Sequence, residues 1–161
     1  MAFIIRKMKK EDTKQVQDVA KKCWKSTYDQ IIPHNIQESF LKVAYSDEMV
    51  EKRLKESFIF VAEVENDVVG FANFTPVNDE GQSKLGAIYI YPNSQDKGIG
   101  TALLQKGIDQ LVGVREIYID VEKENNIGKT FYNTKGFKTI KEYDDNFEGH
   151  ILKTVQMCLT V

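Results

Sequence analysis

Apolar residues along this chain follow a helical spacing in some segments and form the near-continuous runs of buried strands in others. Between Glu11 and Cys23 they recur every three or four positions, which predicts a helix with one buried stripe. The run Phe58–Val64 is apolar and rich in β-branched residues, which predicts a strand. In chain order we expect a strand over 3–7, helices over 11–23, 36–43 and 47–56, strands over 58–64, 68–75 and 85–91, a helix over 98–112, a strand over 116–121, a helix over 126–135, and strands over 137–143 and 152–159.

Turn and cap residues support several of these boundaries. Glu65, Asn66 and Asp67 separate two strand-like runs, and an Asn-Asp turn in that position predicts a β-hairpin. Asp47 is expected to cap the helix at which it stands. The order of elements predicts one mixed sheet with helices on its faces, so we expect an α/β (α+β) chain with a single domain over 1–161.

The composition indicates a globular protein and argues against two kinds of partner. Of the 161 residues, 42% are hydrophobic and 29% are charged, as in ordinary folded domains. The formal net charge of −2 gives no support to nucleic-acid binding, which needs a concentrated positive surface. No apolar run approaches the roughly 20 residues of a membrane span, and the first residues do not resemble a signal peptide, so we expect a cytoplasmic protein without membrane contact.

The two cysteines, Cys23 and Cys158, stand near opposite ends of the sequence. Their spacing indicates neither a metal cluster nor a redox pair. We expect two reduced thiols, as is usual in the cytosol, and no metal site.

The stretch 85–104 carries the clearest chemical signal. A predicted strand runs into a loop that opens directly into a helix and contains Gln95, Lys97, Gly98 and Gly100. Glycine lets a ligand approach the backbone closely, and a helix start offers unpaired N–H groups at the positive end of the helix dipole. Lys97 adds a mobile positive charge. The stretch is therefore predicted to hold a pyrophosphate.

Two other phosphate-binding motifs fit this chain less well. The dinucleotide fingerprint would need a third glycine where Leu103 stands. The triplet Gly128-Lys129-Thr130 is like the end of a P-loop, but the first glycine of that motif would have to replace Lys123. Both alternatives fail on spacing.

Two blocks of sequence carry more information together than either does alone. The first is Gln95-x-x-Gly98-x-Gly100 after a strand that ends in Ile88-Tyr89-Ile90-x-Pro92, and the second is Val121-x-x-x-Asn125-x-x-Gly128-x-x-Phe131-Tyr132-x-x-x-Gly136-Phe137. Their order and distance resemble the two conserved blocks of the Gcn5-related N-acetyltransferase (GNAT) family, over most of the chain. The resemblance implies a central mixed, mostly antiparallel twisted sheet of six to seven strands flanked by about four to five helices. It also implies transfer of an acetyl group from acetyl-CoA to an amine.

The resemblance further implies roles for single residues. The backbone of Ile88, Tyr89 and Ile90 would pair with the pantetheine arm of coenzyme A, and Asn125 would bond to the same region. Tyr132 would protonate the departing thiolate, which a phenol of pKa about 10 can do for a thiol of pKa about 8.5. The other residues expected to contact the cofactor are Gln95, Asp96, Lys97, Gly98, Ile99, Gly100, Thr101 and Lys135.

The chain departs from the family pattern in two places. Many members carry a glutamate base on the strand before the pyrophosphate loop, but the equivalent position here is Lys84. An amine is mostly protonated at neutral pH, so another group must accept its proton before it can attack. Candidates are Asp79, Glu80, Tyr28, His150 or a chain of water molecules. Asp96 stands where many relatives have Gly or Arg, and it should weaken cofactor binding slightly unless it points to solvent or pairs with Lys97.

The acceptor is indicated by weaker signals. The segment Trp24–Pro33 is similar to a subgroup of the family that includes bacterial polyamine acetyltransferases, with Tyr28 and Asp29 expected to face the acceptor and Trp24 expected in the core. Four carboxylates near the C-terminus would attract a polycation such as spermidine or spermine, although a solvated loop explains them equally well. They are Glu142, Asp144, Asp145 and Glu148.

We expect direct transfer to a small-molecule amine in a ternary complex, because neither cysteine lies in the two blocks. One alternative is an acyl-CoA-binding sensor without turnover, which Lys84 in place of the glutamate favours and Tyr132 disfavours. Another is an N-acetyltransferase for a protein, a peptide or an antibiotic. A homodimer is common in the family, but no segment of this sequence indicates an interface.

Overall fold

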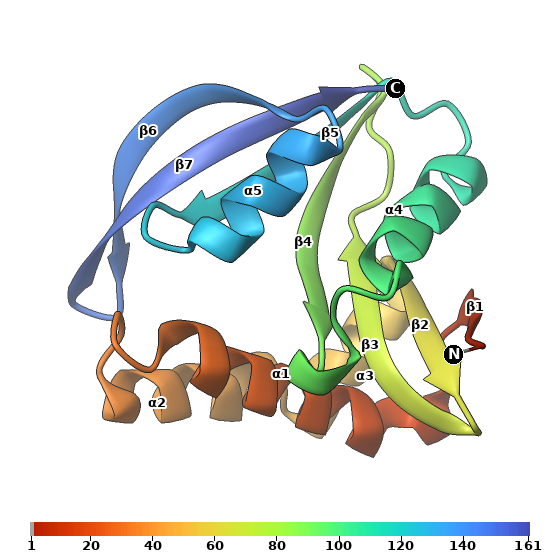
Figure 1. The fold of residues 1–161 in the computed structure, drawn as a ribbon, viewed down its shortest axis with the longest axis horizontal. Coiled ribbons are helices and arrows are strands. Elements are labelled where there is room, and N and C mark those ends of the chain that lie inside the picture. Colours follow the sequence, from red (N-terminus) through yellow and green to blue (C-terminus); the bar gives the residue numbers. More distant parts are fainter. Residues whose placement is uncertain (1) are drawn as a thin grey trace.

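The computed structural model describes residues 2–161 (Figure 1). Every helix and strand expected from the sequence is present, together with two short 3-10 helices, η1 and η2. In chain order the elements are β1 (Ile4–Lys7), η1 (Lys10–Asp12), α1 (Thr13–Tyr28), α2 (His34–Ala44), α3 (Asp47–Glu56), β2 (Phe58–Val64), β3 (Asp67–Phe74), β4 (Gln82–Ile90), η2 (Pro92–Ser94), α4 (Ile99–Gln110), β5 (Glu116–Glu122), α5 (Asn126–Thr134), β6 (Lys138–Phe147) and β7 (His150–Thr160).

The seven strands form one sheet in the order β1-β2-β3-β4-β5-β7-β6. All neighbouring strands are antiparallel except β4 and β5, which run parallel. The expected fold class, a mixed and mostly antiparallel sheet with flanking helices, is therefore confirmed. Figure 1 shows that β4 and β5 lie together near the C-terminus and then diverge.

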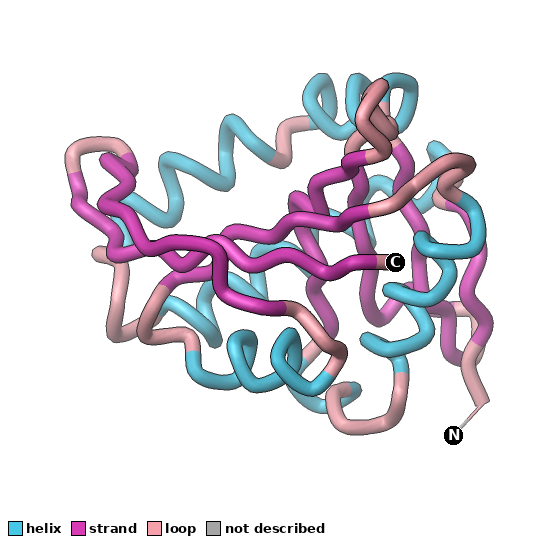
Figure 2. Tube along the Cα trace, turned by 90° about the horizontal axis from the view of Figure 1, so that it is seen from above, coloured by secondary structure: helices cyan, strands magenta, loops and turns pink. Residues whose placement is uncertain are grey.

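Helices cover both faces of the sheet where β2 runs, which explains why β2 is apolar throughout instead of alternating. Phe60 and Ala62 belong to a core shared with α4, whereas Ile59 and Val61 belong to a core shared with α1 and α3. Figure 2 shows the helices on the two sides of the strand layer.

A glycine allows α4 to pack directly against β3. A Cβ atom on Gly107 would lie 2.3 Å from Cζ of Phe74. Phe74 is fully buried, so its ring cannot move aside without disturbing the core. This close packing determines where the N-terminus of α4 lies relative to the end of β4.

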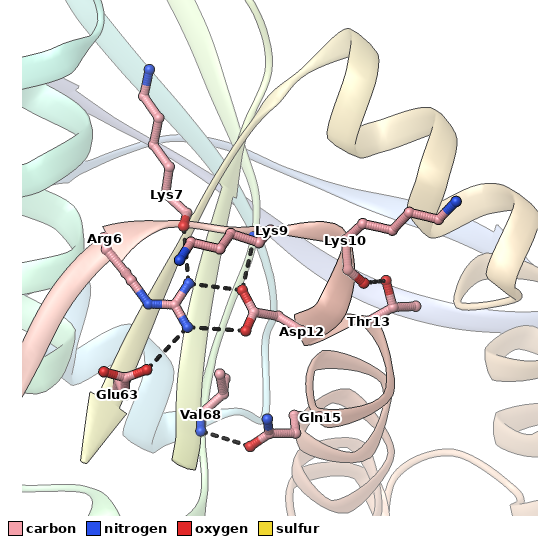
Figure 3. A network of polar contacts seen from close by, with 9 residues as sticks. All are labelled: Arg6, Lys7, Lys9, Lys10, Asp12, Thr13, Gln15, Glu63 and Val68. Atoms are coloured by element: carbon pink, nitrogen blue, oxygen red, sulfur yellow. Dashed lines mark hydrogen bonds and ion pairs between the residues drawn. The ribbon is translucent and has the colours of Figure 1, made fainter. Parts of the chain in front are cut away.

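A polar network holds β1 and the start of α1 against β2 (Figure 3). The Arg6 guanidinium donates to both carboxylate oxygens of Asp12, at 2.8 and 2.9 Å, and to Glu63 at 3.1 Å. The backbone N–H of Lys9 also donates to Asp12, at 2.8 Å. The hydrogen bonds between Arg6 and Asp12 lower the pKa of Asp12 and raise that of Arg6.

The hairpin turn is confirmed, whereas one predicted cap was wrong. Glu65 and Asn66 take positive φ angles of 50° and 72° between β2 and β3, as a tight hairpin turn requires. The N-cap of α3 is Ser46, whose Oγ accepts the Met49 N–H at 3.2 Å. Asp47 is instead the first residue of the helix, where its negative charge still interacts favourably with the dipole.

The strands β6 and β7 are longer than expected, and their tip packs against helices. β6 continues to Phe147, so Asp144 and Asp145 lie on a strand and not in a loop. Because β6 is an edge strand, it tolerates polar side chains along its length. At the tip the ring of Phe147 lies 5.7 Å from that of Trp24 and 4.8 Å from that of Phe40, between centroids. The β6–β7 hairpin is thereby joined to α1 and α2.

Candidate active site

The sheet opens between β4 and β5. Pairing between these two strands ends at Lys84 and Tyr118. Beyond those residues the strands have no register with each other, and Figure 1 shows them parting. We call this region, which comprises residues Leu85–Ile90 of β4 and Ile119–Glu122 of β5, the β4–β5 split.

One edge of β4 presents backbone groups to the split. The Tyr91 N–H donates to the Val69 carbonyl of β3 at 2.9 Å, and bonded positions alternate along an antiparallel pair. Tyr89 therefore also directs its backbone to β3, whereas Ile88 and Ile90 direct theirs into the split. The resemblance implies that all three residues pair with the pantetheine arm. The geometry leaves that role to Ile88 and Ile90, because the sheet already engages the backbone of Tyr89.

The Ile90 carbonyl already accepts two hydrogen bonds. The Cys23 thiol donates to it at 3.1 Å, and Gln95 Nε2 donates to it at 3.1 Å. Burial raises the pKa of Cys23 to about 12, so the thiol stays protonated as a donor. Gln95 ties its loop back to the end of β4, and the N–H groups of Ile88 and Ile90 remain as donors facing the split.

The loop before α4 takes two left-handed conformations. Gly98, the N-cap, has φ 85°, and Asp96 has φ 62°, a region natural for glycine and uncommon for aspartate. The first bond of the helix runs from the Ala102 N–H to the Gly98 carbonyl, at 3.0 Å. The amides of residues 99–101 precede that bond, so they are available to an anion at the positive end of the helix dipole.

Two charged side chains flank this helix start. Lys97 Nζ donates to the Asn93 carbonyl at 3.0 Å and not to Asp96. Both Asp96 and Lys97 are exposed. Since an exposed carboxylate is screened by solvent, Asp96 does little to prevent anion binding.

The start of α4 packs under α5. A Cβ atom on Gly100 would lie 3.1 Å from Cε1 of Phe131 and 3.3 Å from Cδ1 of Ile90, so this glycine serves packing as well as the predicted approach of a ligand. Lys135 follows one turn later, with Nζ 5.6 Å from the centre of the Phe131 ring. The structure thus brings Lys135 to the same side of α5 as the residue that contacts the helix start.

Asn125 begins α5 as its N-cap. Its Oδ1 accepts the Gly128 N–H at 3.0 Å. A Cβ atom on Gly128 would lie 2.7 Å from Asn125 Nδ2, so glycine makes room for the cap. Within residues 2–161 Nδ2 has no acceptor by hydrogen-bond geometry, and it is available to a ligand.

Tyr132 combines a buried ring with a reachable hydroxyl. The side chain is 7% exposed, and its ring lies 5.4 Å from that of Phe137. Burial raises the pKa of Tyr132 well above its usual range, with smaller contributions from Tyr89 and Tyr28. Tyr132 Oη has no hydrogen-bond partner in the described chain. Only one unbonded side-chain polar atom there, Arg53 Nη1, is sealed from solvent, so Tyr132 Oη is accessible. The phenol stays protonated, as a proton donor must.

Aromatic side chains of α1 and β4 contact one another. Trp24 is buried, its Nε1 donates to Tyr89 Oη at 2.9 Å, and its ring lies 4.6 Å from that of Tyr28. Burial raises the pKa of Tyr28, and nearby Tyr89 and Glu122 raise it further. Tyr89 and Tyr28 in turn raise the pKa of Tyr132. Trp24 thus lies in the core, as expected, and Tyr28 packs against it.

A carboxylate of β5 reaches the position where β4 lacks one. Asp120 Oδ2 lies 2.6 Å from Lys84 Nζ, and Gln156 Nε2 donates to Asp120 Oδ1 at 3.4 Å. Asp120 stands two residues beyond Tyr118, the partner of Lys84, and so projects from the same face of β5. Asp120 is not among the bases expected from the sequence, which were Asp79, Glu80, Tyr28, His150 or water. The available signal was a carboxylate between two apolar residues, Ile119 and Val121, inside a predicted strand.

Glu122, the last residue of β5, brings a second carboxylate to the split. It is 7% exposed, and its Oε2 accepts the Glu124 N–H at 2.7 Å. Burial raises the pKa of Glu122. None of the ion pairs found in residues 2–161 includes it. Glu122, like Asp120, is not among the site residues expected from the sequence.

The other predicted substrate residues do not converge on Tyr132. Asp29 is the exposed C-cap of α1. Glu80 lies beside Asp79 in the exposed β3–β4 turn, at the opposite end of β4 from Ile90. His150 begins β7 at the tip of the β6–β7 hairpin.

The acidic stretch near the C-terminus is largely engaged in local contacts. Lysines neutralise two of its four carboxylates and a serine donates to a third, so the field that would attract a polycation is reduced. The pairs are Glu142 with Lys123 and Asp144 with Lys153, at 2.8 Å each, and Glu148 with Ser39 at 3.1 Å.

Three further features of the described residues concern metal binding, membrane spanning and surface hollows. Across residues 2–161 no three His, Cys, Asp or Glu side chains converge to form a metal site. No helix in the same range has the length and apolar character that spanning a membrane would require. A surface hollow of about 290 Å³ lies between α5 and β6, but Tyr132 is not among the residues that line it.

A sheet opened between two parallel strands, with a helix start offering free amides at the opening, is the architecture of an N-acetyltransferase. Comparison with known families agrees, since the model of the acetyltransferase (GNAT) family matches residues 15–137. This chain belongs to that family.

Individual relatives support the assignment. An uncharacterized N-acetyltransferase, YuaI, of Bacillus subtilis is 34% identical over 89% of this chain and 84% of its own length. A spermidine N(1)-acetyltransferase of Thermoplasma acidophilum is 29% identical over 86% of this chain and 89% of its own. The crystal structure of the PaiA N-acetyltransferase from the same organism, in complex with coenzyme A, matches the fold with a TM-score of 0.89 at 24% identity, over 100% of both chains.

Proposed function

We propose that this protein transfers the acetyl group of acetyl-CoA to a primary amine, directly and in a ternary complex. The observation that carries the proposal is the meeting of three features at the β4–β5 split. These are the unpaired N–H groups of Ile88 and Ile90, the free amides at the start of α4, and the accessible hydroxyl of Tyr132.

The residues of the split fit acetyl-CoA group by group. The amides of residues 99–101 and the nearby Lys97 suit the pyrophosphate. The N–H groups of Ile88 and Ile90 suit the peptide-like pantetheine arm, which can lie beside β4 as an added strand. Asn125 Nδ2 offers one further donor. Coenzyme A or acetyl-CoA in the solved structures of two GNAT-fold proteins is consistent with this placement.

The chemistry requires the protonated amine to lose two protons on its way to the amide and the sulfur to gain one. Asp120 is the carboxylate nearest to the position of the missing strand glutamate, and we propose that it accepts the amine proton, directly or through water. The nitrogen lone pair then attacks the thioester carbonyl, which backbone N–H groups polarise. The C–S bond breaks as the amide forms, and Tyr132 supplies a proton to the thiolate. The second proton of the former ammonium group leaves the nitrogen and restores the Tyr132 phenol.

A polyamine is the acceptor that we propose first. The support is the similarity to a spermidine N(1)-acetyltransferase and the carboxylates Asp120 and Glu122 inside the split. The acidic stretch on β6 contributes less than expected from the sequence, because most of it is paired.

The test is release of free thiol from acetyl-CoA in the presence of polyamines, amino acids, aminoglycosides and short peptides. Release with one class of amine, together with that amine gaining one acetyl group by mass spectrometry, supports the proposal and identifies the acceptor. Release with no amine from a protein that binds acetyl-CoA tightly refutes it.

A sensor without turnover is the second candidate, and the specific observation that favours it is Lys84 in place of the strand glutamate. Asp120 weakens this reading, because it restores a carboxylate to the same position from β5. The thiol-release panel separates the two, since a sensor binds acetyl-CoA and releases no thiol.

A further inference from the structure

Glu122 is a buried carboxylate whose nearby cation, Lys129, stays outside ion-pair distance. It is 7% exposed, and its one side-chain bond is the Glu124 N–H at 2.7 Å. Buried charges in proteins are normally paired, because transfer of an unpaired charge from water is costly. Within residues 2–161 no lysine, arginine or histidine forms an ion pair with it. A cation supplied from outside would therefore complete this site.

The position of Glu122 places it beside the reacting groups. On β5 it stands two residues beyond Asp120 on the same face, about 6–7 Å further along the strand. Tyr28 is near enough to Glu122 for the carboxylate to raise its pKa, and it also raises the pKa of Tyr132. A ligand group at Glu122 would thus belong to a molecule whose other end lies near Asp120 and Tyr132.

The surroundings of Glu122 suit an alkyl ammonium group. Its neighbour across the sheet is Thr154 of β7, and Leu152, two residues earlier on the same face, packs with Trp24 and Tyr28. Aromatic faces attract cations, and the apolar side chains beside them suit a hydrocarbon chain.

We propose that Glu122 and Tyr28 form a subsite for a second ammonium group of the acceptor, so that the enzyme prefers diamines and polyamines to monoamines. The inference rests on the proposed function, because it takes the split to be the acceptor site. It names Glu122 as the residue that determines specificity, whereas Asp120 and Tyr132 carry the transfer. The separation of Asp120 and Glu122 along β5 is similar to that of the two nitrogens in an extended four-carbon diamine.

The test compares putrescine with butylamine, which share a four-carbon chain and differ in the second ammonium group. Each is titrated by calorimetry into the full-length protein saturated with coenzyme A, so the result does not depend on turnover. We expect putrescine to bind about tenfold more tightly than butylamine, as one ion pair with cation–π support allows. In Glu122→Gln the two amines should bind about equally, because the amide carries no charge. The amide oxygen still accepts the Glu124 N–H, so the local fold is kept.

Glu124→Gln is the matched control, since it removes a neighbouring exposed carboxylate and should leave the preference near tenfold. Equal affinity of the wild type for the two amines would overturn the proposal, even if the Glu122 variant failed to fold. A preference that persists in folded Glu122→Gln would also overturn it and would assign Glu122 a purely structural role before α5. Failure of the proposed function shows differently, as absence of thiol release with every amine.

Discussion

The packing of α4 on β3 leads to a prediction whose sign opposes simple helix propensity. Gly107 lies inside α4, where alanine is intrinsically better than glycine by about 1 kcal/mol. In this fold, however, a Cβ atom would lie 2.3, 2.5 and 2.8 Å from three ring atoms of Phe74, far inside the ordinary contact distance of about 3.5–4.0 Å. Overpacking of a rigid core costs about 1–3 kcal/mol, and contacts this short belong at the upper end.

We therefore expect Gly107→Ala to lower the free energy of unfolding by about 2 kcal/mol, the difference between the two effects. For a chain of this size the melting temperature should fall by about 4–8 °C. Urea denaturation followed by circular dichroism measures the first quantity, and calorimetry the second.

A double-mutant cycle supplies the control. The three nearest atoms to the added Cβ belong to the far end of the Phe74 ring, and Phe74→Leu removes them. In the Phe74→Leu background Gly107→Ala should be neutral or stabilising by up to about 1 kcal/mol. If Gly107→Ala stabilises the wild-type protein, or costs the same in both backgrounds, then α4 does not pack on β3 as described.

Three other predictions follow from the network at β1, from the thiols and from the proton acceptor. Asp12→Asn should lower the free energy of unfolding by about 2 kcal/mol, because it removes the bidentate partner of Arg6. Since the folded-state pKa of Asp12 lies below its usual 3.8, this contribution is complete above pH 3.8 and is lost as the pH falls further. Urea titrations of the wild type and the variant at pH 7 and pH 3 will show the difference. The double variant Cys23→Ala, Cys158→Ala should retain turnover, because transfer is direct. Loss of all turnover from the folded double variant would indicate a covalent route. In the wild type Cys23 should resist alkylation at pH 8, since its pKa is about 12. Asp120→Asn should lower kcat about 100-fold with an unchanged melting temperature, and unchanged kcat would remove Asp120 from the mechanism.

The sequence predicts the local elements well where pattern and turn chemistry agree. The helix Asp47–Glu56 and the hairpin turn at Glu65 and Asn66 are found as expected, because each depends on residues close together in the chain. The end of β6 was mispredicted, since Asp144 and Asp145 look like loop residues until the edge position of the strand is known.

The candidate site was predictable only in the parts that lie in one segment. The loop before α4, the cap Asn125 and the phenol of Tyr132 all belong to the two sequence blocks. The Lys84–Asp120 pair depends on strands that are 36 residues apart at that point and run in parallel, which no local pattern specifies. The burial of Glu122 depends likewise on helices packed from elsewhere.

The measurement that tests the central claim most directly is the steady-state rate of acetyl-CoA-dependent acetylation in Tyr132→Phe, with the amine that the panel identifies. Tyr91→Phe is the matched control, because its phenol donates to Asp18 on the outer side of α1. If Tyr132 protonates the thiolate in the β4–β5 split, kcat should fall about 100-fold or more in Tyr132→Phe, with KM and the melting temperature little changed, and should stay near the wild-type value in Tyr91→Phe. Equal kcat in the wild type and in Tyr132→Phe would contradict the account.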